Sequence, residues 1–172
     1  MCKEISYRTA TTRDAEEMVA VHFRSVQAIP ECFYSASIKE SWSPEPDSNR
    51  VAWLSGVIAS EDTIVTVAQR NENVVGFIIY SSPEHQINAL YVDPSFAGQG
   101  IGAHLLRTIE ESGEVGGITL KASLNAVNFY SRVGFTKVRE SEQRLSDGEV
   151  MAAVDMVKAV GGTPINAVNK DG

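Results

Sequence analysis

A glycine-rich turn between a strand and a helix constrains the fold of this chain most strongly. The apolar run at residues 86–92 predicts a strand that ends at Asp93-Pro94, and residues 100–112 predict an amphipathic helix. From Gly98 to Gly102 every second residue is glycine, which permits positive φ angles and lets a ligand approach the main chain closely. Free N–H groups and the dipole at the start of a helix favour an anion. On its own, the turn fits a phosphate site and a simple tight turn equally well.

The spacing of these glycines argues against two other kinds of phosphate-binding turn. No Gly-Lys-Ser/Thr triplet follows, so the turn is not a P-loop. Its pattern is G-x-G-x-G in mid-chain, whereas the dinucleotide fingerprint is G-x-G-x-x-G near the start of a parallel sheet. A nucleotide-binding domain of another class is therefore disfavoured.

Hydrophobic periodicity in the rest of the chain predicts one mixed α/β domain over residues 1–160. Alternating or β-branched runs predict six more strands, at residues 5–9, 63–69, 74–80, 118–122, 135–138 and 151–157. Helical spacing predicts further helices, at residues 11–28, within 31–46, after a cap at Asp47 or Ser48, and at 126–133. The second and third strands of the chain form a hairpin, and the sheet is antiparallel at first and partly parallel later. Residues 161–172 lack periodicity and core residues, so we expect a flexible tail.

Composition and charge limit the class of protein. The 172 residues are 43% hydrophobic and carry a net charge of −7, which fits a single globular domain. Binding a polyanion requires a basic surface, so we expect no nucleic-acid partner, and the negative charge suits a cationic acceptor such as an amine. No run approaches the ~20 apolar residues of a membrane span, and the N-terminus lacks a secretory signal. We therefore expect a cytoplasmic protein with no membrane partner. Cys2 and Cys32 make no disulfide framework, and the absence of a Cys/His cluster predicts no metal site.

Two motifs in sequence order carry a family resemblance. The first runs from Val92-Asp93-Pro94 through Gly98-Gln99-Gly100-Ile101-Gly102, and the second, about 25 residues later as in a strand–helix–strand unit, is an Ala-x-x-Phe-Tyr helix at Ala126 to Tyr130 followed by Gly134-Phe135. Together they resemble the GNAT superfamily of acyl-CoA N-acyltransferases. The resemblance implies a central, mostly antiparallel mixed sheet of six to seven strands flanked by helices. It also implies a splayed strand pair at the cofactor site, and a homodimer is compatible with this fold.

The resemblance also implies an activity, transfer of an acetyl group from acetyl-CoA to a primary amine, and roles for particular residues. The pantetheine arm would lie between residues 86–92 and 118–122, bound by main-chain groups as an added strand would be. The amides of the glycine turn would hold the pyrophosphate, and Tyr130 would protonate the departing thiolate. The implied cofactor-binding residues are Leu90, Tyr91, Val92, Gly98, Gln99, Gly100, Ile101, Gly102, Ser123, Asn125 and Phe129.

The chemistry of acyl transfer fits these groups. Attack by a neutral amine on a thioester creates an oxyanion that a strand N–H stabilises, and a phenol within reach of the sulfur helps the thiolate to leave. No covalent enzyme intermediate is needed, so the transfer is expected to be direct, in a ternary complex. The general base is unassigned: Glu84 and His85 precede the strand and are candidates, although the pattern favours residues of a solvated turn.

Some features of the sequence leave alternatives open. Ala97 stands where the family usually has Gln or Arg, and Ser123 stands where Asn is common. The family often has a glutamate as general base on the strand that corresponds to residues 86–92, and this strand has none. Together with Ala97, that absence allows a second hypothesis, a non-catalytic acyl-CoA sensor or scaffold. The aromatic residues Phe33, Tyr34 and Trp42 either shape an acceptor pocket or only cover the sheet. The acceptor itself, a small-molecule amine or a protein amine, is not identified by the sequence.

Overall fold

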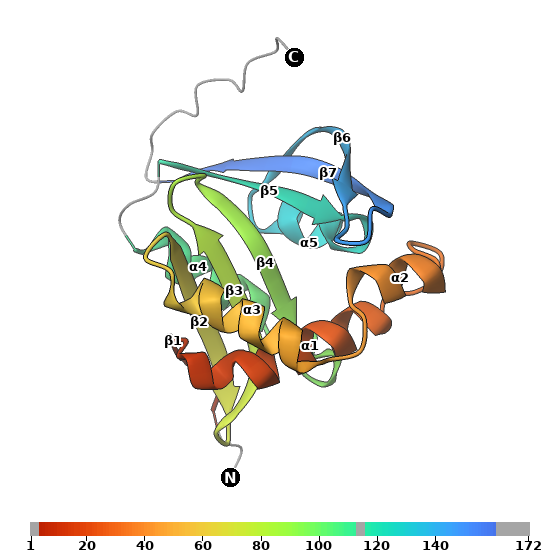
Figure 1. Cartoon of the computed structure of the whole chain (residues 1–172). Coiled ribbons are helices and arrows are strands. Elements are labelled where there is room, and N and C mark those ends of the chain that lie inside the picture. The colour runs from red at the N-terminus through yellow and green to blue at the C-terminus, as the bar shows by residue number, and fades with distance from the viewer. Residues whose placement is uncertain (1–3, 113–115, 161–172) are drawn as a thin grey trace.

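A seven-stranded sheet runs through the part of the chain that the computed structural model describes, residues 4–112 and 116–160 (Figure 1). The spatial order is β1-β2-β3-β4-β5-β7-β6, and every neighbouring pair is antiparallel except β4 and β5. The strands are β1 Ser6–Thr9, β2 Thr63–Arg70, β3 Asn73–Ser81, β4 Gln86–Val92, β5 Gly117–Ser123, β6 Thr136–Arg144 and β7 Val150–Ala159. This arrangement confirms the predicted mixed, mostly antiparallel sheet.

Helices cover both faces of the sheet (Figure 1). The helices are α1 Ala15–Gln27, α2 Ala36–Trp42, α3 Ser48–Ala59, α4 Ile101–Glu110 and α5 Val127–Arg132. Helices α1 and α3 pack on one face of the sheet, and α4 packs on the other. Strand β3 is buried on both faces, because Phe77 belongs to the core beneath α1 and α3 while Ile78 belongs to the core beneath α4. Within the described ranges, no helix has the length and apolar character needed to cross a membrane.

Strands β4 and β5 separate soon after they meet. Only two pairs join them, Gln86 with Thr119 and Ile87 with Leu120. Beyond Ile87 the strands diverge, as Figure 1 shows, while β5 stays paired with β7 along its whole length. The register of β3 with β4 also shifts between the pairs Ile79–Ala89 and Tyr80–Ile87, which leaves Asn88 as an extra residue on β4. Such bulges re-aim main-chain groups beside functional sites, and this one lies where the strands begin to separate.

Two parts of the fold differ most from the sequence-based expectation. The predicted four-residue turn between β2 and β3 is a two-residue turn, in which Asn71 and Glu72 both take positive φ, 51° and 70°. Strand β6 extends to Arg144, well beyond the predicted end at residue 138. Its second half consists of polar residues because β6 is an edge strand with few buried positions, so no alternating apolar pattern marks it. Residues 161–172, the predicted tail, lie outside the described residues.

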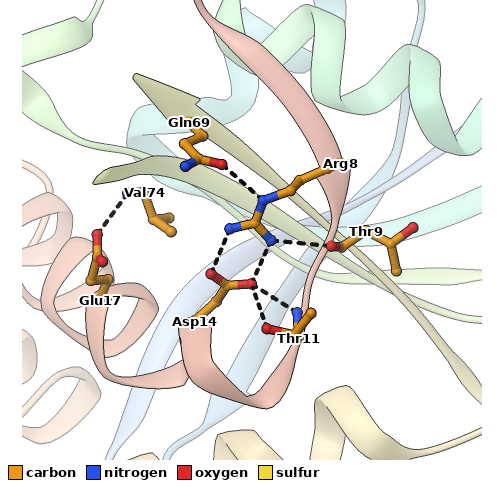
Figure 2. A network of polar contacts seen from close by, with 7 residues as sticks. All are labelled: Arg8, Thr9, Thr11, Asp14, Glu17, Gln69 and Val74. Carbon is orange, nitrogen blue, oxygen red and sulfur yellow. Dashed lines mark hydrogen bonds and ion pairs between the residues drawn. The ribbon is translucent and has the colours of Figure 1, made fainter. Parts of the chain in front are cut away.

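A polar network ties β1 to the start of α1 (Figure 2). The Arg8 guanidinium donates to both carboxylate oxygens of Asp14 at 2.8 Å and to Gln69 Oε1 at 2.8 Å. The same carboxylate accepts a hydrogen bond from the Thr11 N–H at 2.8 Å, the contact expected of a helix start. These hydrogen bonds, that from Arg8 foremost, hold the pKa of Asp14 below its ordinary value although burial opposes the shift. The network therefore stabilises the junction between β1 and α1 when Asp14 is ionised.

Replacement of Asp14 by Asn should lower the free energy of unfolding by about 1 kcal/mol at pH 7, a value kept small because Arg8 is partly exposed. Because the folded pKa is depressed, the stabilisation is present above the unfolded pKa of about 3.9 and is lost as the pH falls through the lower folded pKa. Urea denaturation of both proteins at pH 7 and pH 3 measures this, and the deficit should shrink at pH 3. An equal deficit at both pH values would show that shape, rather than charge, carries the effect.

Candidate functional site

A cavity of about 910 Å³ opens where β4 and β5 separate. Its walls come from β4 and β5, from helices α1 to α3, and from the β6–β7 hairpin. Four residues that the family resemblance singled out line it: Leu90, Tyr91, Ser123 and Tyr130. The fold thus brings residues from distant parts of the chain to one opening beside the divergent strands.

Tyr130 presents a protonated phenol to this cavity. The residue is only 7% exposed, and its ring packs edge-on against Phe129 and Phe135. Burial, reinforced by Tyr91, raises the pKa of Tyr130 above its ordinary value. The hydroxyl has no hydrogen-bond partner among the described residues. A protonated hydroxyl that faces a cavity and has no partner among the described residues is suited to donate a proton to a bound group.

The glycine turn forms a cluster of free amides at the start of α4. Gly98 and Gly100 both have φ of +77°, a region that favours glycine, and Gly100 is the N-cap of α4. Across the described residues, the amides from Gly98 to Gly102 find no hydrogen-bond acceptor, the first helical bond being from His104 N–H to the Gly100 carbonyl. The residues of this turn are not among those that line the 910 Å³ cavity. The free amides of the turn and the cavity therefore lie in separate places, and amides at the start of a helix favour an anion.

Gly102 has a different role from the other two glycines, because it lies within the helix. A Cβ placed on Gly102 would lie 3.1 Å from Phe129 Cζ and 3.8 Å from Val92 Cγ2. Glycine here lets α4 approach α5 and the end of β4 closely. Gly102, Phe129 and Val92, three residues that the resemblance assigns to the cofactor, thus meet beside the glycine turn. The Val92 carbonyl also accepts a hydrogen bond from Ser25 Oγ of α1 at 2.9 Å.

An aromatic cluster of His22, Trp42 and Tyr91 lines the cavity where α1 and α2 approach β4. His22 lies edge-on to Tyr91 with 4.4 Å between ring centroids, and Trp42 is 6.3 Å from both. The three aromatic residues whose role the sequence leaves open have different surroundings. Trp42 lines the cavity. Tyr34 joins layers of the fold, because its hydroxyl donates to the Ala152 carbonyl at 2.6 Å and accepts from the Leu124 N–H at 2.8 Å. Phe33 is 41% exposed.

His22 should remain neutral throughout the physiological pH range. Burial, with a further contribution from the positive charge of Arg50, lowers the pKa of His22 to about 3. Its Nδ1 lies 2.7 Å from Ser43 Oγ and 3.2 Å from an Arg50 nitrogen. We predict that the ring resonances of His22 in an NMR titration do not move between pH 5 and pH 8. A midpoint near 6.5 would contradict the burial of this ring against a cation.

The two candidate bases lie away from the cavity lining. Glu84 and His85 occupy the exposed connection between β3 and β4, where His85 has φ of 51° and its Nδ1 lies 3.3 Å from the Tyr80 hydroxyl. Asn125, the other candidate for the cofactor arm, is exposed and does not line the cavity, whereas Ser123 does. The roles of Glu84, His85 and Asn125 therefore stay predictions.

Three cationic residues of the cavity wall were not anticipated from the sequence. The charged residues in the lining are Asp47, Arg50, Lys121 and Arg144, so cations outnumber carboxylates although the whole chain has a net charge of −7. The Asp47 carboxylate caps α3 by accepting from the Arg50 N–H at 2.8 Å. No local signal marks these cations, because isolated arginine and lysine residues in a helix or a strand are normally interpreted as solvated residues.

Comparison with known proteins agrees with the geometry. Residues 34–159 match the family model of the acetyltransferase (GNAT) domain. The uncharacterized N-acetyltransferase YafP of Escherichia coli K12 is 30% identical over 136 residues, which are 79% of this chain and 84% of that protein.

Solved structures show the same fold. A GCN5-related N-acetyltransferase from Rhodopseudomonas palustris has a TM-score of 0.79 at 24% identity, covering 93% of this chain and 98% of that one. The PaiA N-acetyltransferase from Thermoplasma acidophilum, solved in complex with coenzyme A, has a TM-score of 0.73 at 21% identity, covering 91% and 99%. The domain match, the sequence relative and the splayed sheet agree, and the chain therefore belongs to the GNAT family of acetyltransferases and is an acyltransferase.

Proposed function

We propose that the protein transfers an acetyl group from acetyl-CoA directly to a primary amine held in the 910 Å³ cavity. The observation that carries the proposal is the unpartnered hydroxyl of Tyr130, which lies in the cavity at the divergence of β4 and β5. Acetyl-CoA as the acyl donor is supported by family membership and by the CoA complex of the PaiA structure, which shares the fold.

The protein offers matching groups for each part of acetyl-CoA. In our proposal the free amides from Gly98 to Gly102 bind the pyrophosphate, aided by the α4 dipole. Unpaired main-chain groups of β4 beyond Ile87 bind the pantetheine arm as a missing neighbouring strand would. Ser123 lines the opposite wall of the gap and supplies a hydroxyl to the arm. The thioester then reaches the cavity near Tyr130.

The chemistry then proceeds without a covalent enzyme intermediate. The amine nitrogen attacks the thioester carbonyl carbon, the C–N bond forms, and the C–S bond breaks. A main-chain N–H of the bulged segment at Asn88 stabilises the oxyanion. Tyr130 gives its proton to the departing sulfur, and the proton lost by the amine restores the phenol through water. Holding the two substrates side by side supplies much of the acceleration.

A screen of amines with acetyl-CoA tests this proposal, with release of the CoA thiol followed by a chromogenic reagent and the products identified by mass spectrometry. We expect an N-acetylated product with at least one amine and no gain of acetyl mass on the protein when the acceptor is absent. A stable acetyl-protein adduct that the amine then discharges would contradict direct transfer. Binding of acetyl-CoA without turnover of any amine would instead favour the sensor or scaffold reading.

A further inference from the structure

The guanidinium of Arg50 lies in the cavity wall among neutral hydrogen-bond partners. It extends from the first turn of α3 into the cavity wall. Its side chain donates to the Pro44 carbonyl, and one terminal nitrogen lies 3.1 Å from Ser43 Oγ and 3.2 Å from His22 Nδ1. All three acceptors are neutral, since His22 is held in its neutral form. Three of the five N–H donors of the guanidinium are engaged in this way, which leaves two available.

Among the described residues, no carboxylate forms an ion pair with Arg50. The five ion pairs found among residues 4–112 and 116–160 do not include it. Asp47, the carboxylate nearest along the chain, acts on Arg50 only at longer range and accepts the main-chain N–H of Arg50. Arg50 is partly buried, and burial lowers its pKa below the ordinary value of an arginine. A cation in a cavity wall without a carboxylate partner among the described residues is a candidate ligand-binding position.

The cavity lining holds two further cations, Lys121 and Arg144. Lys121 is paired with Asp155 at 3.0 Å, and Asp155 is shared with Arg139 at 2.8 Å, so two cations there face one carboxylate. Arg144 also lines the cavity and takes no part in an ion pair with a described residue. The cavity therefore attracts anions, in contrast to the negative charge of the whole chain.

We propose that Arg50 binds a carboxylate of the acceptor, so that the acceptor is an amino acid or a similar aminocarboxylate rather than a simple amine or polyamine. This inference rests on the proposed function. The two free N–H donors lie on Nε and on Nη1, on different edges of the guanidinium, so a carboxylate accepts from one of them in a charge-assisted hydrogen bond. His22 and Ser43 are positioning residues that fix the guanidinium, and the acceptor amine then points from Arg50 toward the thioester near Tyr130.

Matched acceptor pairs test the inference. Each pair consists of an amino acid and the amine left by removing its carboxylate: phenylalanine with 2-phenylethylamine, methionine with 3-(methylthio)propylamine, and leucine with 3-methylbutylamine. We measure kcat and KM by CoA release, and we measure binding to the CoA-saturated protein by calorimetry. In at least one pair the acid should exceed its amine by about tenfold or more in kcat/KM and in affinity, as expected for a charge-assisted pair.

Variants of Arg50 show whether that residue causes the preference. Arg50→Met retains the apolar stem, and Arg50→Gln retains hydrogen-bond donors without charge, so that a folding defect in one does not decide the result. Both should lose the advantage of the acid, chiefly through KM. Arg13→Met, which removes an exposed arginine outside the cavity lining, should retain it. A preference that survives in both Arg50 variants, or the absence of any acid preference in the wild type, would overturn the inference.

The design separates this inference from the proposed function. Turnover of amines without any preference for acids would leave the proposed function standing and remove the anionic acceptor. Tighter calorimetric binding of an acid than of its amine, lost in both Arg50 variants, would support the carboxylate site even if no acceptor were acetylated. In that case the proposed function alone would be wrong.

Discussion

Replacement of Tyr130 by Phe should lower kcat by about 100-fold or more while the affinity for acetyl-CoA changes by less than about threefold. Tyr130 lines the cavity and is 7% exposed, burial raises its pKa, and its hydroxyl has no hydrogen-bond partner among the described residues. Its removal therefore leaves no described group unsatisfied, and the fold should be retained. Turnover is measured by CoA release at saturating substrate, and affinity by calorimetric titration with acetyl-CoA.

A second tyrosine provides the matched control for this experiment. Tyr7 stacks on His104 with 3.7 Å between ring centroids, on β1 at the edge of the sheet and outside the cavity lining. Tyr7→Phe should retain kcat within about twofold, since it removes a hydroxyl of the same kind from a position without a catalytic role. A Tyr130→Phe protein as active as the Tyr7→Phe protein would contradict proton donation by Tyr130.

Gly100→Pro should abolish measurable binding of acetyl-CoA. Proline fixes φ near −65°, whereas Gly100 has φ of +77° and begins α4. The substitution also removes one of the free amides of the turn. Both effects act on the proposed pyrophosphate site, while the core side of α4, at Ile101 and Leu105, keeps its side chains. Calorimetric titration with acetyl-CoA measures the effect, after circular dichroism and thermal unfolding show that the variant is folded.

The control at the same position is Gly100→Asn. Asparagine tolerates positive φ better than most residues and retains its N–H, and a Cβ at Gly100 would meet no atom within 4 Å. This variant should bind acetyl-CoA within about tenfold of the wild type. Full affinity in the folded Gly100→Pro protein would show that the turn is a structural feature and that the cofactor binds elsewhere.

Elements defined by local physical chemistry could be predicted from the sequence. The β2–β3 hairpin follows from two β-branched runs around polar turn residues. The turn from Gly98 to Gly102 could be predicted because glycine is needed where φ is positive or where packing is very close. Both needs occur here: Gly100 has a positive φ, and Gly102 packs closely against Phe129. The parallel pairing of β4 and β5 was anticipated from the helix between them.

Features that depend on tertiary contacts could not be predicted in the same way. Arg50 lies one turn after a helix cap, where the sequence indicates a solvated side chain, and only the packing of α3 against α1 places it beside His22 and Ser43. The aromatic contacts of Trp42 with Tyr91 join residues far apart in the chain. The proposed acceptor side of the site depends on contacts between residues far apart in the chain. The proposed cofactor side consists of contiguous motifs, so the sequence predicts the cofactor side far better than the acceptor side.

A crystal structure of the protein with coenzyme A is the measurement that tests the account most directly. We predict that the pantetheine arm lies between β4 and β5 and that the pyrophosphate contacts the amides from Gly98 to Gly102. The CoA sulfur should lie within hydrogen-bond distance of the Tyr130 hydroxyl. Coenzyme A bound away from the gap between the two strands, or a sulfur remote from Tyr130, would contradict it.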